Sequence, residues 1–187
     1  MIFHRIYRKK FEIFDWLLNK IRILHLRFKY PKLILKGDCR IGKNCHIVCA
    51  DSSSIYLDTV AISNGAHIVA SNGGHIKISK SFIGSNSLIV SINKITIEEN
   101  CELAEFVVIR DQDHKFNFSN NPIGEQGYES APVVIESNVW VGAKATILKG
   151  VIVGRNSVVG AHSLVNKNID SCTLVAGIPA KEIKTNK

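Results

Sequence analysis

"IESNVWVGAKATILKGVIVGRNSVVGAHSLV", residues 135–165, carries a large aliphatic residue at every sixth position. These residues are Ile135, Val141, Ile147, Val153, Val159 and Val165. Glycine follows Val141, Val153 and Val159 directly, where a tight corner favours a residue without Cβ. A period of six residues does not match the period of an α-helix, and the repeat is longer than any single strand. It predicts an all-β solenoid of stacked short parallel strands.

The N-terminal half repeats with a longer unit, because the segments 40–60, 61–81 and 82–100 align with one another. Each segment contains three short apolar stretches. The equivalent residues of the second stretch are Ile47, Ile68 and Ile89. Three strands in each repeat predict one turn of a triangular prism, so we expect about six coils in the whole chain.

The repeat is interrupted once. Ile109 is the next counterpart of Ile89, but the strand that should follow after six to eight residues begins only at Val133. We therefore expect an inserted loop at about 112–130, with "DQDHKF" (111–116) at its root. Repeat folds place such insertions on one face, which is often the binding face.

The positive charge lies almost entirely at the N-terminus. Residues 1–32 contain nine Lys or Arg and two acidic residues, which is +7 of the total +8. The remainder of the chain is close to neutral, so the charge does not indicate a nucleic-acid-binding protein. We divide the chain into a basic segment (1–32), a solenoid (33–170) and a tail (171–187).

The basic segment has the apolar pattern of one amphipathic helix, or of two, ending before Pro31. Two compatible interpretations follow: residues 1–30 lie on an anionic membrane surface, or they pack on the protein's own trimer. No stretch of eighteen apolar residues and no signal-peptide pattern is present. We expect a cytoplasmic protein, with the inner face of the cell membrane as the alternative location.

The sequence from Val139 to Ile169, followed by "VAGIPAKEIK" (175–184), resembles the hexapeptide-repeat acyltransferases, in particular their sugar O-acetyltransferase branch. The resemblance extends over about residues 33–187. It implies a left-handed parallel β-helix, a homotrimer with active sites between subunits, and acetyl-CoA as co-substrate without a metal. It also implies that His114, on the inserted loop, is the general base that deprotonates the acceptor hydroxyl.

The same resemblance implies a cofactor site. Its residues are Trp140, Gly142, Ala143, Gly160, Ala161, Asn166, Lys167, Lys181 and Lys184. Trp140 would flank the acetyl-CoA channel, the Gly-Ala pairs would line the pantetheine arm, and the polar residues would lie near the adenine and phosphates. Asn166 departs from the family pattern, since a hydroxyl residue is common there.

The residue chemistry fits this role. An imidazole with a pKa near 6.5 can accept a proton from a sugar hydroxyl at cellular pH. Asp111 or Asp113 would orient the ring, and a backbone N–H of Gly142 or Ala143 would stabilise the oxyanion. Phe116, Phe118 and Tyr128 would either form a platform for a sugar ring or pin the loop against the prism.

Several functions remain to be weighed. The first is transfer of acetyl to a hydroxyl of a bacterial surface polysaccharide, capsule or O-antigen, or its precursor, by direct attack. The alternative within the enzyme class is N-acetylation of an amino sugar or acetylation of a xenobiotic. More distant are a non-enzymatic solenoid and a zinc carbonic anhydrase, for which the chain lacks the HxxxxH pair. The five cysteines have no CxxC pair and indicate reduced thiols.

Overall fold

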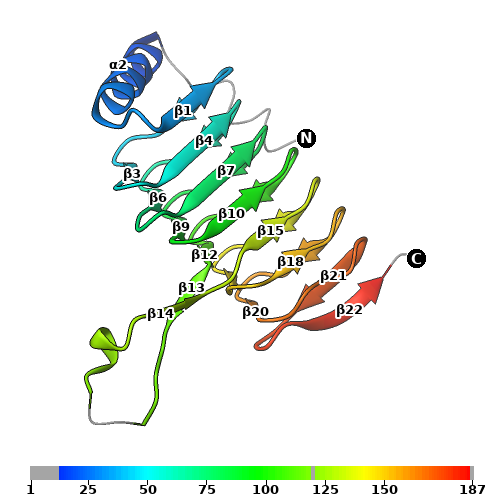
Figure 1. Ribbon diagram of the computed structural model, residues 1–187. Coiled ribbons are helices and arrows are strands. Elements are labelled where there is room, and N and C mark those ends of the chain that lie inside the picture. The colour runs from blue at the N-terminus through cyan, green and yellow to red at the C-terminus, as the bar shows by residue number, and fades with distance from the viewer. Residues whose placement is uncertain (1–12, 119–120, 186–187) are drawn as a thin grey trace.

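The computed structural model describes residues 13–118 and 121–185. One helix, α2 (Ile13–Lys29), precedes a stack of short strands that forms a triangular prism, with α2 at one end and the C-terminal hairpin at the other (Figure 1). The three faces of the prism are three sheets, which we name A, B and C; their strands are parallel except for the last strand of sheet B, which pairs antiparallel with its neighbour. A separate antiparallel hairpin extends away from the prism (Figure 1). The predicted β-solenoid of about six coils is confirmed.

Each coil contributes one strand to each face, in the order B, C, A. Sheet A contains β1 (Leu33–Lys36), β4 (Ser54–Asp58), β7 (His75–Ser79), β10 (Lys94–Ile97), β15 (Val133–Ile135) and β18 (Ile152–Val153). Sheet B contains β2 (Arg40–Ile41), β5 (Ala61–Ile62), β8 (Phe82–Ile83), β11 (Glu102–Leu103), β16 (Trp140–Val141), β19 (Val158–Val159), β21 (Thr173–Ala176) and β22 (Lys181–Thr185). Sheet C contains β3 (His46–Cys49), β6 (His67–Ala70), β9 (Leu88–Ser91), β12 (Val108–Arg110), β17 (Thr146–Ile147) and β20 (Leu164–Val165).

The register of the coils follows the sequence repeat. In sheet C, Ile47 pairs with Ile68, Ile68 with Ile89, and Ile89 with Ile109, as the alignment of the repeats predicts. These four side chains point inward and are buried. Because every strand alternates inward and outward residues, one aliphatic column from each face fills the interior. The core is therefore a stack of isoleucine, leucine and valine layers.

The repeat glycines are required by close approach of the next coil. Gly142 and Gly154 do not have a positive φ. A Cβ on Gly142 would lie 2.6 Å from the backbone nitrogen of Ala161, and one on Gly154 would lie 2.4 Å from that of Ser171. The positive φ in these two turns belongs to Lys144, after Gly142, and to Asn156, after Gly154. Glycine thus permits coil stacking, whereas the residue two positions later adopts the left-handed conformation of the turn.

The helix α2 covers the N-terminal end of the prism, where β1 and β2 would otherwise leave an open edge. Asn19 is buried and forms two hydrogen bonds with the backbone at β2. Its Nδ2 donates to the carbonyl of Cys39, just before the strand (3.1 Å), and its Oδ1 accepts from the N–H of Ile41 (2.8 Å). Arg22 donates to the Ile41 carbonyl, and Arg27 donates to the Leu35 carbonyl of β1 at 2.7 Å. One face of the helix is therefore part of the protein structure, as one of the two interpretations of this segment requires.

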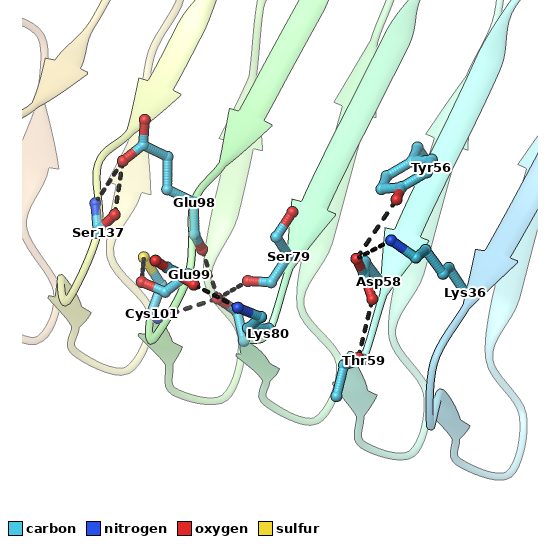
Figure 2. A network of polar contacts seen from close by, with 11 residues as sticks. Lys36, Tyr56, Asp58, Thr59, Ser79, Lys80, Glu98, Glu99, Cys101 and Ser137 are labelled. Atoms are coloured by element: carbon cyan, nitrogen blue, oxygen red, sulfur yellow. Dashed lines mark hydrogen bonds and ion pairs between the residues drawn. The ribbon is translucent and has the colours of Figure 1, made fainter.

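The corner between sheets A and B carries polar contacts from coil to coil (Figure 2). Lys80 forms an ion pair with Glu99 of the next coil at 2.8 Å. Glu98 accepts two hydrogen bonds from Ser137, one from its N–H (3.0 Å) and one from its hydroxyl (2.7 Å). These contacts lie at the surface, so the buried aliphatic columns remain the main source of stability.

Candidate active site

The inserted segment leaves the prism at the corner between sheets C and A. It forms an antiparallel hairpin of β13 (Gln112–His114) and β14 (Tyr128–Ser130), with a short 3₁₀ turn, η1 (Ile123–Glu125), in the connection. The Ala131 N–H donates to the Asp111 carbonyl at 2.9 Å and closes the neck of the hairpin. The chain then re-enters the prism at β15. The hairpin therefore projects a short, stiff pair of strands from one corner.

Asp111 anchors the root of this hairpin and is fully buried. Its carboxylate accepts hydrogen bonds from the Ser91 hydroxyl (2.5 Å) and from the N–H groups of Ile92 (2.9 Å) and Asn93 (3.0 Å). All three donors belong to the preceding coil. Asp111 therefore holds the exit of the hairpin on the prism, and its oxygens are directed to the coil rather than to the expected imidazole partner.

Sequence reasoning missed this role, although a signal for it was present. Asp111 follows the inward-pointing Ile109 by two residues, at the position that Ser91 holds in the preceding coil and Ala70 in the one before. The period of two that orients Ile109 inward therefore also orients Asp111 inward. Asp113 points out of the prism and is exposed.

Asp113 is bonded to Lys149, a second residue that the sequence did not single out. The Lys149 ammonium lies 2.7 Å from an Asp113 oxygen and 3.9 Å from a Glu129 oxygen, so it bridges both strands of the hairpin. The hydrogen bond to Asp113 raises the pKa of the Lys149 ammonium. Since Lys149 lies in the coil after the insertion, the hairpin is tied to the coils on both sides of it.

His114 is exposed at the end of β13, opposite Tyr128 in the register of the hairpin. The centroids of the two rings lie 4.4 Å apart at an interplanar angle of 39°. Tyr128 thus supports one side of the imidazole. Gln112 precedes it on the same face of β13 and is buried, and its Oε1 is one of two buried side-chain oxygens without a hydrogen-bond partner in the described residues. The hairpin thus presents one histidine to the surroundings on a fixed strand.

Phe116 and Phe118 lie beyond His114 and contact each other edge-to-face at 6.0 Å between ring centroids. Both side chains are exposed. They do not pin the loop against the prism of their own chain, which was one of the two roles considered for them. An exposed aromatic pair next to His114 remains available for a ligand or a neighbouring chain.

The expected cofactor residues fall into two groups. The first group lies on sheet B, at its corner with sheet C, and along β22, and comprises Trp140, Gly142, Ala143, Gly160, Ala161, Lys181 and Lys184. The side chain of Trp140 is 55% exposed on the outer surface of β16. Asn166 and Lys167 form the second group, because they follow β20 at the corner between sheets C and A, where the hairpin also leaves.

The two groups are separated by the width of sheet C. The longest strands of that face have four residues, which corresponds to a width of at least about 13 Å at 3.3 Å per residue. His114 and Trp140 therefore lie on different sides of one prism. Within a single chain the hairpin leaves the prism at the corner between sheets C and A. The two Gly-Ala pairs, Gly142-Ala143 and Gly160-Ala161, lie at the corner between sheets B and C, which we call the Gly-Ala corner.

The cysteines are part of the prism rather than of this site. Cys39, Cys49 and Cys101 are buried, and burial raises the pKa of the Cys101 and Cys45 thiols. Among residues 13–118 and 121–185, no group of three His, Cys, Asp or Glu side chains is arranged to hold a metal ion.

Comparison with protein families gives a match to the family described as "Bacterial transferase hexapeptide (six repeats)", over residues 132–167. This segment is the one in which the period of six was found. Residues 132–167 thus carry the hexapeptide repeat of this transferase family, in line with the resemblance found in the sequence.

Two relatives illustrate the extent of the similarity. A probable acetyltransferase of Mycobacterium tuberculosis, Rv3034c, is 27% identical over 178 residues, which is 92% of this chain and 58% of the relative. A putative lipopolysaccharide biosynthesis O-acetyl transferase of Escherichia coli (strain K12), WbbJ, is 41% identical over 103 residues, 51% of this chain and 53% of the relative. The chain thus spans about half the length of the curated hexapeptide relatives it matches.

A solved structure with the same fold is AntD, an N-acyltransferase from Bacillus cereus determined in complex with dTDP and 3-hydroxybutyryl-CoA. The TM-score is 0.72 at 19% sequence identity, over 89% of this chain and 88% of AntD. The similarity extends over nearly the whole of both chains. It supports the hexapeptide-repeat fold at a level of identity that carries no information about the substrate.

Proposed function

We propose that this protein is an acetyl-CoA-dependent O-acetyltransferase that acylates a hydroxyl of a sugar in a bacterial surface polysaccharide or its precursor. The Escherichia coli relative, a putative lipopolysaccharide biosynthesis O-acetyl transferase, supports this class of acceptor. His114 removes the hydroxyl proton as the oxygen attacks the thioester carbonyl, and coenzyme A leaves as the thiol. The acetyl group passes directly to the sugar, without an enzyme-bound intermediate.

The observation that carries the proposal is the position of His114. It is exposed on a hairpin that is fixed to the prism by Asp111 and Lys149 and supported laterally by Tyr128. A general base must lie within hydrogen-bond reach of the proton that it removes, so a stiff support is an advantage. In this proposal Asp111 and Asp113 act by holding the hairpin, and Phe116 and Phe118 contact the sugar ring.

We further propose a homotrimer with its active sites between subunits. His114 and the Gly-Ala corner lie on different sides of one prism, whereas a neighbouring prism can bring its hairpin against that corner. The cofactor would then lie between Trp140, Gly142, Ala143, Gly160 and Ala161 of one subunit and the hairpin of the next. Lys181 and Lys184, with Lys167 and Asn166 from the other corner, would contact its phosphates and adenine.

The oxyanion donor can be narrowed to one of the two candidates. The Gly142 N–H donates to the Val159 carbonyl of the next coil at 2.8 Å. This bond belongs to the stacking of the prism, so the donation to a developing oxyanion is assigned to the Ala143 N–H. A backbone donor of this kind is worth about 10²–10³ in rate.

The test is acetyl-CoA turnover with a panel of sugars, measured by release of free thiol. His114→Ala should lower turnover by about 10²–10⁴ and leave coenzyme A binding intact. His46→Ala is the matched control, because His46 is an exposed histidine on sheet C, far from the hairpin. Turnover of the His114 variant near that of the control would show that another group is the base.

The site between subunits has its own test. Chains with His114→Ala and chains with Trp140→Ala are each expected to be inactive or weak. Co-assembly of the two should restore measurable turnover, since some sites would then combine a native His114 with a native Trp140. No restoration in mixed trimers would place both residues in one chain's site. Amino sugars in the same panel distinguish O-acetylation from N-acetylation.

A further inference from the structure

The outward face of α2 carries an apolar stripe that no other part of residues 16–118 and 121–185 covers. Leu17, Ile21, Leu24 and Phe28 follow one another at steps of four, three and four residues, so they lie along one side of the helix. All four are exposed, Leu24 to 70% and Phe28 to 90%. The opposite side holds Asn19, Ile23 and Leu26, which pack on the prism. Two sides of the helix are therefore apolar, and only one of them packs on the prism.

Basic residues flank the stripe, and the sequence between Asp15 and Asp38 contains no acidic residue. Residues 16–36 contain Lys20, Arg22, Arg27, Lys29, Lys32 and Lys36, with no Asp or Glu. On the helix, Lys20 and Arg27 lie along one border of the stripe and His25 and Lys29 along the other. A second copy of this face would bring like charges together. An anionic surface with an apolar interior matches both the charge and the stripe.

A hollow lies beside the stripe, between α2 and β1. It has a volume of about 220 Å³, and Lys20 and Arg27 line it together with Leu24, Leu35 and Gly37. Two cationic side chains around a small hollow suit a phosphate group. Trp16, exposed at the border of the same face, holds the Lys20 ammonium 5.5 Å from its ring centroid. Exposed tryptophan next to lysine is typical of side chains at the lipid–water interface.

We propose that α2 docks the protein on a lipid bilayer that carries anionic headgroups, with the stripe in the acyl boundary and a headgroup phosphate between Lys20 and Arg27. The helix lies across the end of the prism (Figure 1), so its outward face points away from the stack of coils. In the proposed trimer of parallel prisms, three such faces lie at the same end and can contact one membrane surface together. This last step rests on the proposed function, whereas the docking of one helix does not.

The experiment measures binding of the full chain to vesicles of phosphatidylglycerol and phosphatidylcholine in equal parts, by flotation. Binding at low salt is expected, with loss at high salt and little binding to phosphatidylcholine alone. Trp16 reports insertion in a Trp140→Phe background, where its emission should shift to the blue. Absence of binding at low salt overturns the proposal.

Two sets of variants separate the apolar and the charged contributions. Leu24→Gln with Phe28→Gln should weaken binding at least about tenfold, because two large side chains no longer enter the bilayer. Lys20→Gln with Lys29→Gln should weaken it about fivefold for each charge. Ile183→Gln, an exposed isoleucine on β22 at the other end of the prism, is the control and should bind as the parent does.

Two results would identify a different occupant. If Leu24→Gln with Phe28→Gln leaves vesicle binding unchanged but alters the mass found by light scattering, the stripe covers a second copy and the proposal fails. It also fails if both variant sets bind as the control does. Because no readout uses acetyl transfer, an inactive protein that binds vesicles would contradict only the proposed function.

Discussion

Ile109 and His114 lie five residues apart, yet they belong to regions that are held in place in different ways. Ile109 is fully buried between the equivalent residues of two coils. His114 lies on a hairpin in which, among residues 113–118 and 121–132, none is buried. The prism is stabilised by apolar layers, and the hairpin by a few polar contacts at its root. A small number of polar residues therefore controls the position of the candidate base.

The largest effect on stability is expected in the prism. Ile109→Ala removes a side chain from a closed layer of the core and should lower the free energy of unfolding by about 2–5 kcal/mol. Thermal or denaturant unfolding measures the change. Arg110→Ala is the control at the next, outward-pointing position and should change stability by less than about 0.5 kcal/mol. Equal effects of the two substitutions would contradict the assigned orientation of β12.

The next effect is expected at the root of the hairpin. Asp111→Ala leaves the Ser91 hydroxyl and the N–H groups of Ile92 and Asn93 without their acceptor, at a cost of about 1–3 kcal/mol. The prism should remain folded while the hairpin loses its position, so turnover should fall far more than stability. Asp111→Asn keeps one acceptor oxygen and should recover part of both. If Asp111→Ala has the same turnover as the parent, Asp111 does not control the position of the active site.

A smaller effect is expected for the ion pairs that tie the hairpin to the following coil. Lys149→Met removes the contacts to Asp113 and Glu129 and should cost about 0.2–1 kcal/mol, because these groups are partly exposed. The rate of acetyl transfer should fall, whereas coenzyme A binding should not change. The pKa of Lys149 is raised above 10.5, so its contribution is present at neutral pH and is lost as the pH rises through the raised value.

The matched control for Lys149 is Lys80→Met. Lys80 pairs with Glu99 at 2.8 Å, nearly the same distance, but at the corner between sheets A and B (Figure 2). Its loss should have a similar small effect on stability and none on turnover. If both variants lower turnover to the same extent, the effect belongs to the prism in general and not to the hairpin.

The same contrast explains what the sequence could and could not predict. The columns of Ile47, Ile68, Ile89 and Ile109 were predicted in register, because each position repeats and burial selects aliphatic side chains. The hairpin has no repeat. Asp111 and Asp113 look alike in "DQDH", and the alternation from Ile109 would orient both of them inward. Asp113 is exposed because the chain leaves the prism after Asp111, which the sequence does not show.

Lys149 illustrates a further limit. It is one of many lysines in the sequence, and its partners Asp113 and Glu129 come from an insertion whose path no periodicity describes. A residue at a corner of the prism contacts side chains of the inserted segment, and the repeat does not predict which ones these are. The division of the expected cofactor residues between two corners was likewise not evident from their order in the chain, since it follows from which strand each residue leaves.

The smallest effect is expected from thiol modification, since the thiols with raised pKa belong to the prism and the hairpin has none. Burial raises the pKa of Cys39, Cys45, Cys49 and Cys101 above the ordinary 9.0, so less than about one per cent of each is thiolate at neutral pH. In a Cys172→Ser background, iodoacetamide at neutral pH should leave turnover unchanged, and labelling should increase only as the pH rises past 9. Direct attack on the thioester requires no cysteine, whereas a covalent acetyl-cysteine route requires one. Rapid inactivation at neutral pH, prevented by acetyl-CoA, would therefore contradict both the burial of the thiols and the direct mechanism assigned to His114.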